Sequence, residues 1–169
     1  ERHVVDFRSL HQAAAPSEQL RDVYYGFTWA GDSRHAFYTK VDDLMRPWQL
    51  WRHEVGTDQS LDVLVHQEDD PQYFLGVSRS KDKQVITVTM TSSMTTEVHY
   101  VPADRPTEPL RLLDARRHGI EYGVDHYLDL EEVPEAGLDP LKLPAQRYQF
   151  VTLSATGRAA HSANFPQID

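Results

Sequence analysis

The sequence predicts an all-β protein made of repeated four-stranded antiparallel sheets, that is, a partial β-propeller. Three observations predict it. Short runs rich in β-branched residues alternate with turns of Gly, Asp, Ser and Lys along most of the chain. The same succession of an apolar start, a polar turn and a β-rich run occurs up to three times. It begins at Phe27, again at Leu75, 48 residues later, and in a weaker form at Tyr122, another 47 residues on. No long segment has the apolar spacing of an amphipathic helix, so very little helix is expected.

The beginning of the chain is expected to hold one strand and a connector. The strand-like run is HVVDFRSL (3–10). The next segment, HQAAAPSEQLRD (11–22), contains Pro16, which interrupts any helix that the alanines start, so we expect a connector there. The repeated pattern follows in FTWAGDSRHAFYTK (27–40), which has an aromatic start, a Gly-Asp-Ser-Arg turn and an apolar run.

Two hairpins are expected in the middle of the chain. The runs WQLWRHE (48–54) and DVLVHQE (62–68) flank a polar break that contains Gly. The runs YFLGVS (73–78) and QVITVTM (84–90) flank the turn RSKDK. Because strand side chains alternate between two faces, Ile86, Val88 and Met90 are expected to share one face, which packs against a neighbouring sheet, and Val85, Thr87 and Thr89 the other.

The rest of the chain continues the same rhythm with one interruption. EVHYV (97–101) returns from a polar tip, LRLLD (110–114) follows a Pro-rich segment, and IEYGVDHYLDL (120–130) opens a new cycle. The segment 131–146, with three prolines and four acidic residues, is expected to be a loop or a short helical insertion, after which RYQFVTL (147–153) resumes strand character. Four short strands in about 45–50 residues match one propeller blade, while a plain β-sandwich is the alternative fold.

The charge and composition of the chain disfavour several classes of partner. The 169 residues have a formal net charge of −9, whereas nucleic acids and anionic membranes attract basic surfaces, so neither is an expected partner. There is no apolar run long enough to span a bilayer and no signal-peptide pattern. The absence of Cys excludes disulfides and thiolate catalysis but suits any compartment, and we expect a cytoplasmic protein.

A search for catalytic motifs predicts no catalytic residue in this chain. An α/β-hydrolase serine lies in G-x-S-x-G, a strained turn that lifts the nucleophile above the sheet. The nearest strings, GDSRH at Gly31 and GVSRS at Gly76, lack the second Gly. Ser33 and Ser78 are therefore interpreted as turn residues.

Metal and cofactor sites are not expected either. The chain has nine His, but no helical H-x-x-x-H pair, and His53, His66 and His99 lie in strand-like runs where exposed or hydrogen-bonded roles are common. The acidic segment 68–70 lacks the calcium-binding D-x-[DN]-x-[DN]-G pattern. The one dense basic spot, ARRHG (115–119), is interpreted as a partner contact or a solvated turn.

Several motifs resemble one known family. The most specific is RPWQLWRHEVGT (46–57), followed by the turn that contains Ser80 and the triplet Asp125-His126-Tyr127. Over residues 24–127 the chain resembles the propeller domain of the oligopeptidase B (protease II) branch of the prolyl oligopeptidase family. The flanks are fainter, and FVTLSATGRAAHSANFPQID (150–169) is similar to strands of a following blade.

The resemblance implies a fold and a function for the parent protein. Members are serine peptidases in which a seven-bladed propeller caps an α/β-hydrolase domain. They cleave after Arg or Lys, and the propeller restricts access to the active site so that only short peptides are cleaved. Their catalytic triad lies in the hydrolase domain, which residues 1–169 do not contain. The chain is therefore expected to be a non-catalytic fragment of two to three blades, whose partners are its own hydrolase domain and short basic peptides.

Further expectations concern substrate contacts and association. Candidate interdomain or tunnel residues for substrate binding are Arg116, Arg117, His118, Asp125 and His126. Cutting a ring of blades is expected to leave a bare apolar sheet face at each end, so the fragment is expected to self-associate. Two alternatives are a self-contained β-rich binding or scaffold module and a small stand-alone β hydrolase. A reading frame that continues into a G-x-S-x-G domain would favour the peptidase fragment over both.

Overall fold

The computed structural model describes residues 2–8, 18–129 and 147–154, and the regular secondary structure of this part of the chain is almost entirely strand. The only helical element among these residues is a single 3₁₀ turn, η1 (Gln59–Leu61). None of the described residues form a helix with the length and apolarity needed to cross a membrane. The strands in chain order are β1 (His3–Phe7), β2 (Glu18–Val23), β3 (Phe27–Trp29), β4 (His35–Val41), β5 (Pro47–Glu54), β6 (Val63–Gln67), β7 (Phe74–Arg79), β8 (Val85–Thr91), β9 (Thr96–Pro102), β10 (Arg111–Asp114), β11 (Tyr122–Asp129) and β12 (Arg147–Ser154).

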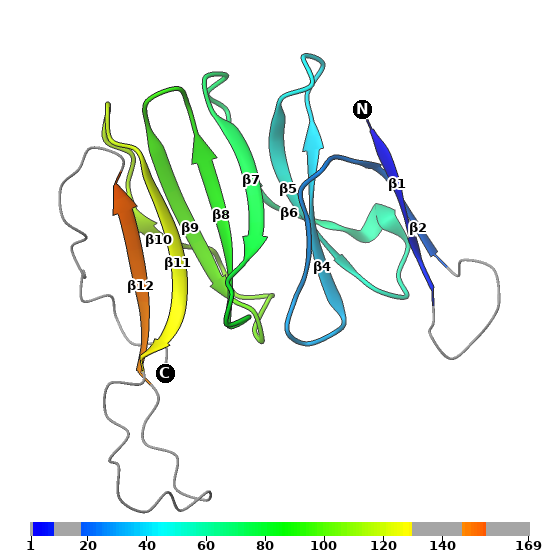
Figure 1. Ribbon diagram of the computed structural model, residues 1–169. Coiled ribbons are helices and arrows are strands. Elements are labelled where there is room, and N and C mark those ends of the chain that lie inside the picture. The colour runs from blue at the N-terminus through cyan, green and yellow to red at the C-terminus, as the bar shows by residue number, and fades with distance from the viewer. Residues whose placement is uncertain (1, 9–17, 130–146, 155–169) are drawn as a thin grey trace, which may run out of the picture.

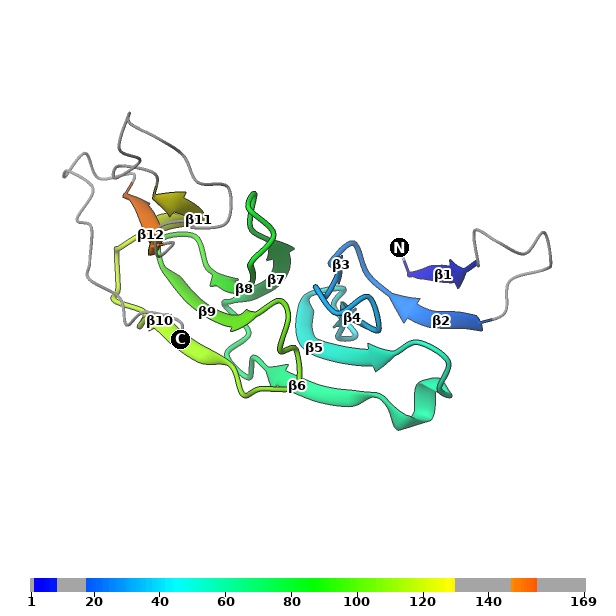
Figure 2. The same ribbon diagram turned by 90° about the horizontal axis from the view of Figure 1, so that it is seen from below.

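The strands form four antiparallel sheets that follow one another along the chain. Two sheets are four-stranded, in the orders β3-β4-β5-β6 and β7-β8-β9-β10, and two are two-stranded, β1-β2 and β11-β12. The sheets stand side by side in sequence order (Figure 1). Seen from below, they fan out from a common side on which β3, β7 and β11 lie (Figure 2). This is the geometry of part of a β-propeller, and it confirms the predicted fold class.

The predicted repeat coincides with the first strand of successive sheets. Strand β3 begins at Phe27, β7 at Phe74 and β11 at Tyr122. The two predicted hairpins are present as the antiparallel pairs β5–β6 and β7–β8. The run 147–153 is strand β12, which pairs with β11, while the insertion expected over 131–146 lies outside the described residues.

The predicted connector over 11–22 is wrong in its last part, because Glu18–Val23 form strand β2 and pair with β1. The pairing shifts register between Val5 and His3, and Asp22 has a left-handed backbone with φ of 57°. This bulge lets Leu20 and Val23, three positions apart, both become buried. The period-2 alternation that marks a strand in the sequence is therefore absent from this segment.

The largest core lies between the two four-stranded sheets. Ile86, Val88 and Met90 have no exposed surface and pack with Phe37 and Leu50 of the preceding sheet, which confirms the predicted inward face of β8. The opposite face of β8 is covered as well, since Val85 is buried in a second cluster with Val98, Tyr100 and Leu113. Both faces of this sheet are therefore packed, as expected for a blade between two neighbours.

The outward face of the β1-β2 sheet is mostly polar. Its exposed side chains are Val4, Asp6, Gln19 and Arg21, and the Gln19 amide donates to the Asp6 carboxylate at 2.8 Å. The expectation of a bare apolar face is therefore wrong at this end of the described chain. The side chains of β12 at the other end lie outside the description.

Candidate functional site at the joints between sheets

We call the contact between neighbouring sheets a joint, and number the joints along the chain. The second joint, between the two four-stranded sheets, contains the first of the candidate residues, Arg116. Its guanidinium donates to both carboxylate oxygens of Glu97, each at 3.1 Å, and to Glu68 of the preceding sheet at 2.6 Å. It also lies 4.0 Å from the ring centre of Tyr73. Arg116 thus ties the connection that follows β10 to the connection that follows β6.

These contacts shift two pKa values at the second joint. Burial by itself raises the pKa of Glu97, but the hydrogen bonds from Arg116 and His99 outweigh it and lower this pKa to about 2. The hydrogen bonds to Glu97 and Glu68 raise the pKa of Arg116. The cluster is therefore a charged network at ordinary pH, and its charges are paired within the chain.

Two histidines from neighbouring sheets meet beside this network. The ring of His66 in β6 lies 5.4 Å, centre to centre, from the ring of His99 in β9. His99 contacts Glu97 at 3.1 Å, whereas the buried Nε2 atom of His66 has no hydrogen-bond partner among the described residues. Burial lowers the pKa of His66, and the nearby His99 lowers it further. His66 is therefore a neutral imidazole at ordinary pH.

The third joint, between the four-stranded sheet of β7 to β10 and the β11-β12 sheet, contains the candidates Asp125 and His126. His126 is 1% exposed, and its Nδ1 atom lies 2.5 Å from the carboxylate of Asp82 in the preceding sheet. Asp125 accepts hydrogen bonds from the backbone N–H groups of His126 at 2.9 Å and Lys81 at 3.3 Å. These bonds lower the pKa of Asp125 against the opposing effect of burial. The pair clamps the β7–β8 turn of one sheet to the first strand of the next.

The first joint, between the β1-β2 sheet and the four-stranded sheet of β3 to β6, is built around His53. This imidazole is fully buried, with Nδ1 2.7 Å from Asp62 and Nε2 2.5 Å from Glu18 of β2. Glu18 also accepts the backbone N–H of Gly56 at 2.9 Å. A neutral imidazole has one N–H, so two such contacts require a second proton on the ring or on a carboxyl group. Because both ring nitrogens are engaged, His53 has no free nitrogen to act as a general base.

The remaining two candidates lie on the surface. Arg117 is largely exposed and pairs with Asp114 at 2.8 Å, and His118 is exposed beside it. The structure therefore places the five candidates in three settings: Arg116 in the second joint, Asp125 and His126 in the third, and Arg117 and His118 on a connection at the surface. It does not gather them into one site. A role of any of them in substrate binding stays a prediction.

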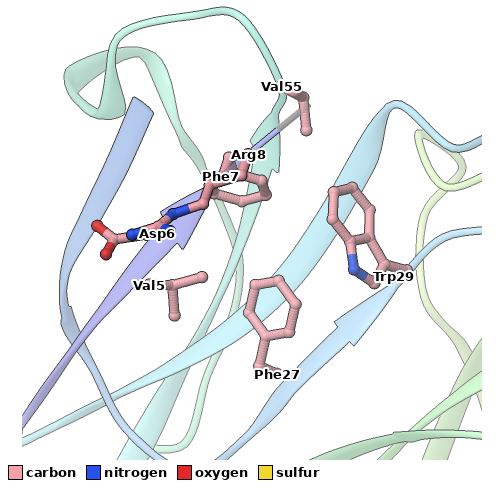
Figure 3. A pocket seen from close by; sticks show the side chains of 7 residues that line it. All are labelled: Val5, Asp6, Phe7, Arg8, Phe27, Trp29 and Val55. Atoms are coloured by element: carbon pink, nitrogen blue, oxygen red, sulfur yellow. The ribbon is translucent and has the colours of Figure 1, made fainter. Parts of the chain in front are cut away.

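An apolar hollow of about 470 Å³ lies beside the first joint (Figure 3). Its walls include Phe7 of β1 and the neighbouring rings of Phe27 and Trp29 of β3. The Phe7 ring meets the Trp29 ring edge to face with centres 5.4 Å apart. Other lining residues are Val5, Asp6, Arg8 and Val55. Its lining suits an apolar side chain better than a charged ligand.

The joints do not resemble a metal site or a nucleophilic centre within the described part of the chain. No group of three or more His, Asp or Glu side chains has an arrangement that suits a metal ion there. The His–carboxylate pairs of His53 and His126 join neighbouring sheets, whereas the pair of His99 and Glu97 lies within strand β9. Their spacing in sequence gives no signal, since the partners of His126 and Arg116 lie 44 and 48 residues away.

Comparison with known proteins identifies the class to which this fold belongs. Residues 1–130 match the family described as "Prolyl oligopeptidase, N-terminal beta-propeller domain", and the chain belongs to this family. It is 37% identical over 131 residues to Protease 2 of Moraxella lacunata, covering 76% of this chain and 19% of that protein. Dipeptidyl aminopeptidase BI of Pseudoxanthomonas mexicana is 27% identical over 128 residues, covering 75% of this chain and 18% of the relative.

Solved structures of oligopeptidase B share the fold. The enzyme from Leishmania major superimposes with a TM-score of 0.71 over 90% of this chain and 19% of its own, at 19% identity. The enzyme from Trypanosoma brucei, in a closed form with covalently bound antipain, gives a TM-score of 0.62 over 83% of this chain and 19% of its own, at 23% identity. The expected resemblance to the propeller of oligopeptidase B is confirmed. The chain spans about a fifth of the length of these relatives.

Proposed function

We propose that residues 1–169 are the non-catalytic propeller portion of a serine oligopeptidase whose α/β-hydrolase domain lies elsewhere in the same polypeptide. The observation that carries this proposal is the match of residues 1–130 to the family's N-terminal propeller, over sheets that repeat along the chain. The sequence also lacks the G-x-S-x-G nucleophile turn, and it corresponds to only 19% of the length of Protease 2.

The parent enzyme acts on short peptides after Arg or Lys in the cytoplasm, and the propeller limits access to its active site. The net charge of −9 supports a basic substrate, because a cleft lined by one sign of charge concentrates the opposite sign. Among the candidate residues, His118 and Arg117 are on the surface and sterically available to a peptide or to the hydrolase domain. The partners in this proposal are the protein's own hydrolase domain and short basic peptides.

The test compares the 169-residue chain with the full-length parent on fluorogenic peptides that end in Arg, Lys or Glu. The chain alone is expected to hydrolyse none of them, and the parent only the Arg and Lys peptides. A length series of Arg peptides then measures access, with cleavage expected to fall sharply as the peptides lengthen.

Two outcomes would reject the proposal. One is turnover by the repurified chain that a serine-directed inhibitor blocks. The other is a stop codon soon after Asp169, which would favour a self-contained binding or scaffold module.

A further inference from the structure

Each side of the second joint contributes a histidine and a glutamate that are two residues apart in sequence. These four residues are His66 and Glu68 on one side, and Glu97 and His99 on the other. His66 lies opposite Leu50, and His99 lies opposite Val88, and both apolar residues belong to the core of the joint. Because directly opposite residues of antiparallel strands share a face, both imidazoles point into the joint. Their ring centres are 5.4 Å apart.

The two glutamates of this set are engaged by Arg116. Its Nη2 group donates to one oxygen of Glu68 at 2.6 Å, and its Nε, Nη2 and backbone N–H groups donate to Glu97, each at 3.1 Å. The second oxygen of Glu68 accepts a backbone N–H of its own connection at 2.9 Å, and His99 Nε2 lies 3.1 Å from Glu97. Every carboxylate oxygen in the set therefore has a partner other than His66.

His66 is the member of the set whose buried nitrogen lacks a partner. Its Nε2 atom makes no hydrogen bond to any described residue. Both nitrogens of an imidazolium carry N–H groups, so a proton on His66 would give the joint a buried donor with no acceptor among the described residues. Burial, His99 and Arg116 lower the pKa of His66 from 6.5, and the charges of Glu68 and Glu97 oppose them. In the closed joint the neutral ring is therefore favoured.

Strand β6, which carries His66, is lightly held in the joint. It is the outermost strand of its sheet and pairs with β5 alone among the described strands. Three of its five residues are exposed: Val63, Leu64 and Gln67. Its contacts across the joint are the packing of Val65 on the core, the imidazole contact and, directly after the strand, the ion pair of Glu68 with Arg116. A segment with few buried contacts opens locally at a low free energy.

We propose that the contact between His66 and His99 is an acid-sensitive latch, which holds β6 against the next sheet while His66 is neutral and releases it when His66 takes up a proton. The proton places a positive charge beside His99 and Arg116, and in the released state water accepts from both N–H groups of the ring. The latch couples pH to the connections after β6 and β10, which Arg116 joins. It is independent of the proposed function, because all of its groups belong to this chain.

Hydrogen exchange followed by mass spectrometry, from about pH 8 to about pH 5, tests the latch in the 169-residue chain. After correction for the intrinsic exchange rate, the opening equilibrium of the β6 amides should rise by up to about tenfold per pH unit below 6.5, since opening is coupled to the uptake of one proton. A low concentration of urea should leave β6 exchange unchanged and speed that of β4, because local opening exposes little surface. His66→Gln should abolish the rise, whereas the exposed control His118→Ala should retain it.

Two further measurements keep the test decisive if His66→Gln does not fold. NMR of the unaltered chain follows the imidazole signals of His66, and their titration should run in parallel with the opening of β6. His99→Gln removes a neighbour that disfavours the charged form of His66, so it should weaken the response to acid. The proposal is overturned if His66→Gln keeps the full pH dependence, if the imidazole titrates without a change in β6 exchange, or if β6 responds to urea as β4 does.

Discussion

The second joint and its two neighbours are held together in different ways. Between the two four-stranded sheets, ten buried residues form one continuous core, and Arg116 adds a polar network beside it. Among the described residues, the apolar clusters at the first and third joints have five and four buried members, and each joint adds a buried imidazole that reaches a carboxylate of the neighbouring sheet. Among the described residues, a buried imidazole–carboxylate contact therefore crosses the two joints that have fewer buried apolar residues.

The difference has a physical reason. Apolar burial scales with area and has no preferred direction, so two full sheets gain enough from it to stay together. A two-stranded sheet offers less area, and a directional contact such as His53–Glu18 or His126–Asp82 fixes its position. Such a contact is sensitive to the loss of one partner, because the partner that remains is a buried polar or charged group.

The largest expected effect tests the apolar joint. Val88→Asp places a carboxylate in the core between the four-stranded sheets, where Val88 has no exposed surface, and should cost several kcal/mol and abolish folding. Thr87→Asp on the other face should be milder, since Thr87 is 6% exposed and already has a polar contact, 2.9 Å from the Ser78 hydroxyl. Urea unfolding and soluble yield measure both. Equal tolerance of the two changes would contradict the described orientation of β8.

A smaller effect is expected at the first joint. His53→Ala leaves Glu18 and Asp62 without their shared partner and should lower the free energy of unfolding by about 3–5 kcal/mol. The double variant His53→Ala, Glu18→Gln should recover part of this loss, because one buried charge is removed. His118→Ala, an exposed control, should stay within about 0.5 kcal/mol of the parent sequence. A His53→Ala protein as stable as this control would refute the clamp.

The contribution of the second joint to the free energy of unfolding should depend on pH in the acid range. The pKa of Glu97 is lowered from 4.5 to about 2 in the folded chain, so the folded state keeps the charged form where the unfolded state takes up a proton. This contribution to stability is complete above pH 4.5 and is lost as the pH falls toward 2. Glu97→Gln should flatten that part of the curve of unfolding free energy against pH. An unchanged slope between pH 4.5 and 2 would contradict the Arg116 network.

The His66–His99 pair should add a weaker pH dependence of the free energy of unfolding at higher pH. The pKa of His66 is lowered from 6.5, mainly by burial, so acidification below pH 6.5 protonates the unfolded state first and reduces stability. His66→Phe should remove this dependence, whereas His118→Ala should retain it. Urea midpoints measured from pH 8 to pH 5 provide the comparison, and a curve of the same shape in His66→Phe would be the contrary result.

The smallest expected effect concerns association. The outward face of the β1-β2 sheet is mostly polar, so the contacts available at this end are the apolar hollow beside Trp29 and the backbone edge of β1, which no other described strand pairs with. We still predict a homodimer or higher assembly of the isolated chain, weakened by Trp29→Ser. Light scattering at several concentrations measures it. A monomeric mass at high micromolar concentration, with a cooperative melt, would be the outcome against it.

Features set by neighbouring residues could be predicted from the sequence. The hairpins, the repeat that starts at Phe27 and the two faces of β8 depend on period-2 alternation and on turn residues within a few positions. The resemblance in RPWQLWRHEVGT likewise identified the family. Strand β2 was missed because the bulge at Asp22 breaks the alternation on which strand prediction depends.

The sequence by itself thus determined the blade as a unit, and the tertiary structure decided how blades meet. The partners of His53, His126 and Arg116 across the joints lie 35, 44 and 48 residues away. Their spacing has no fixed value, because it depends on how much chain the intervening sheet and its loops contain.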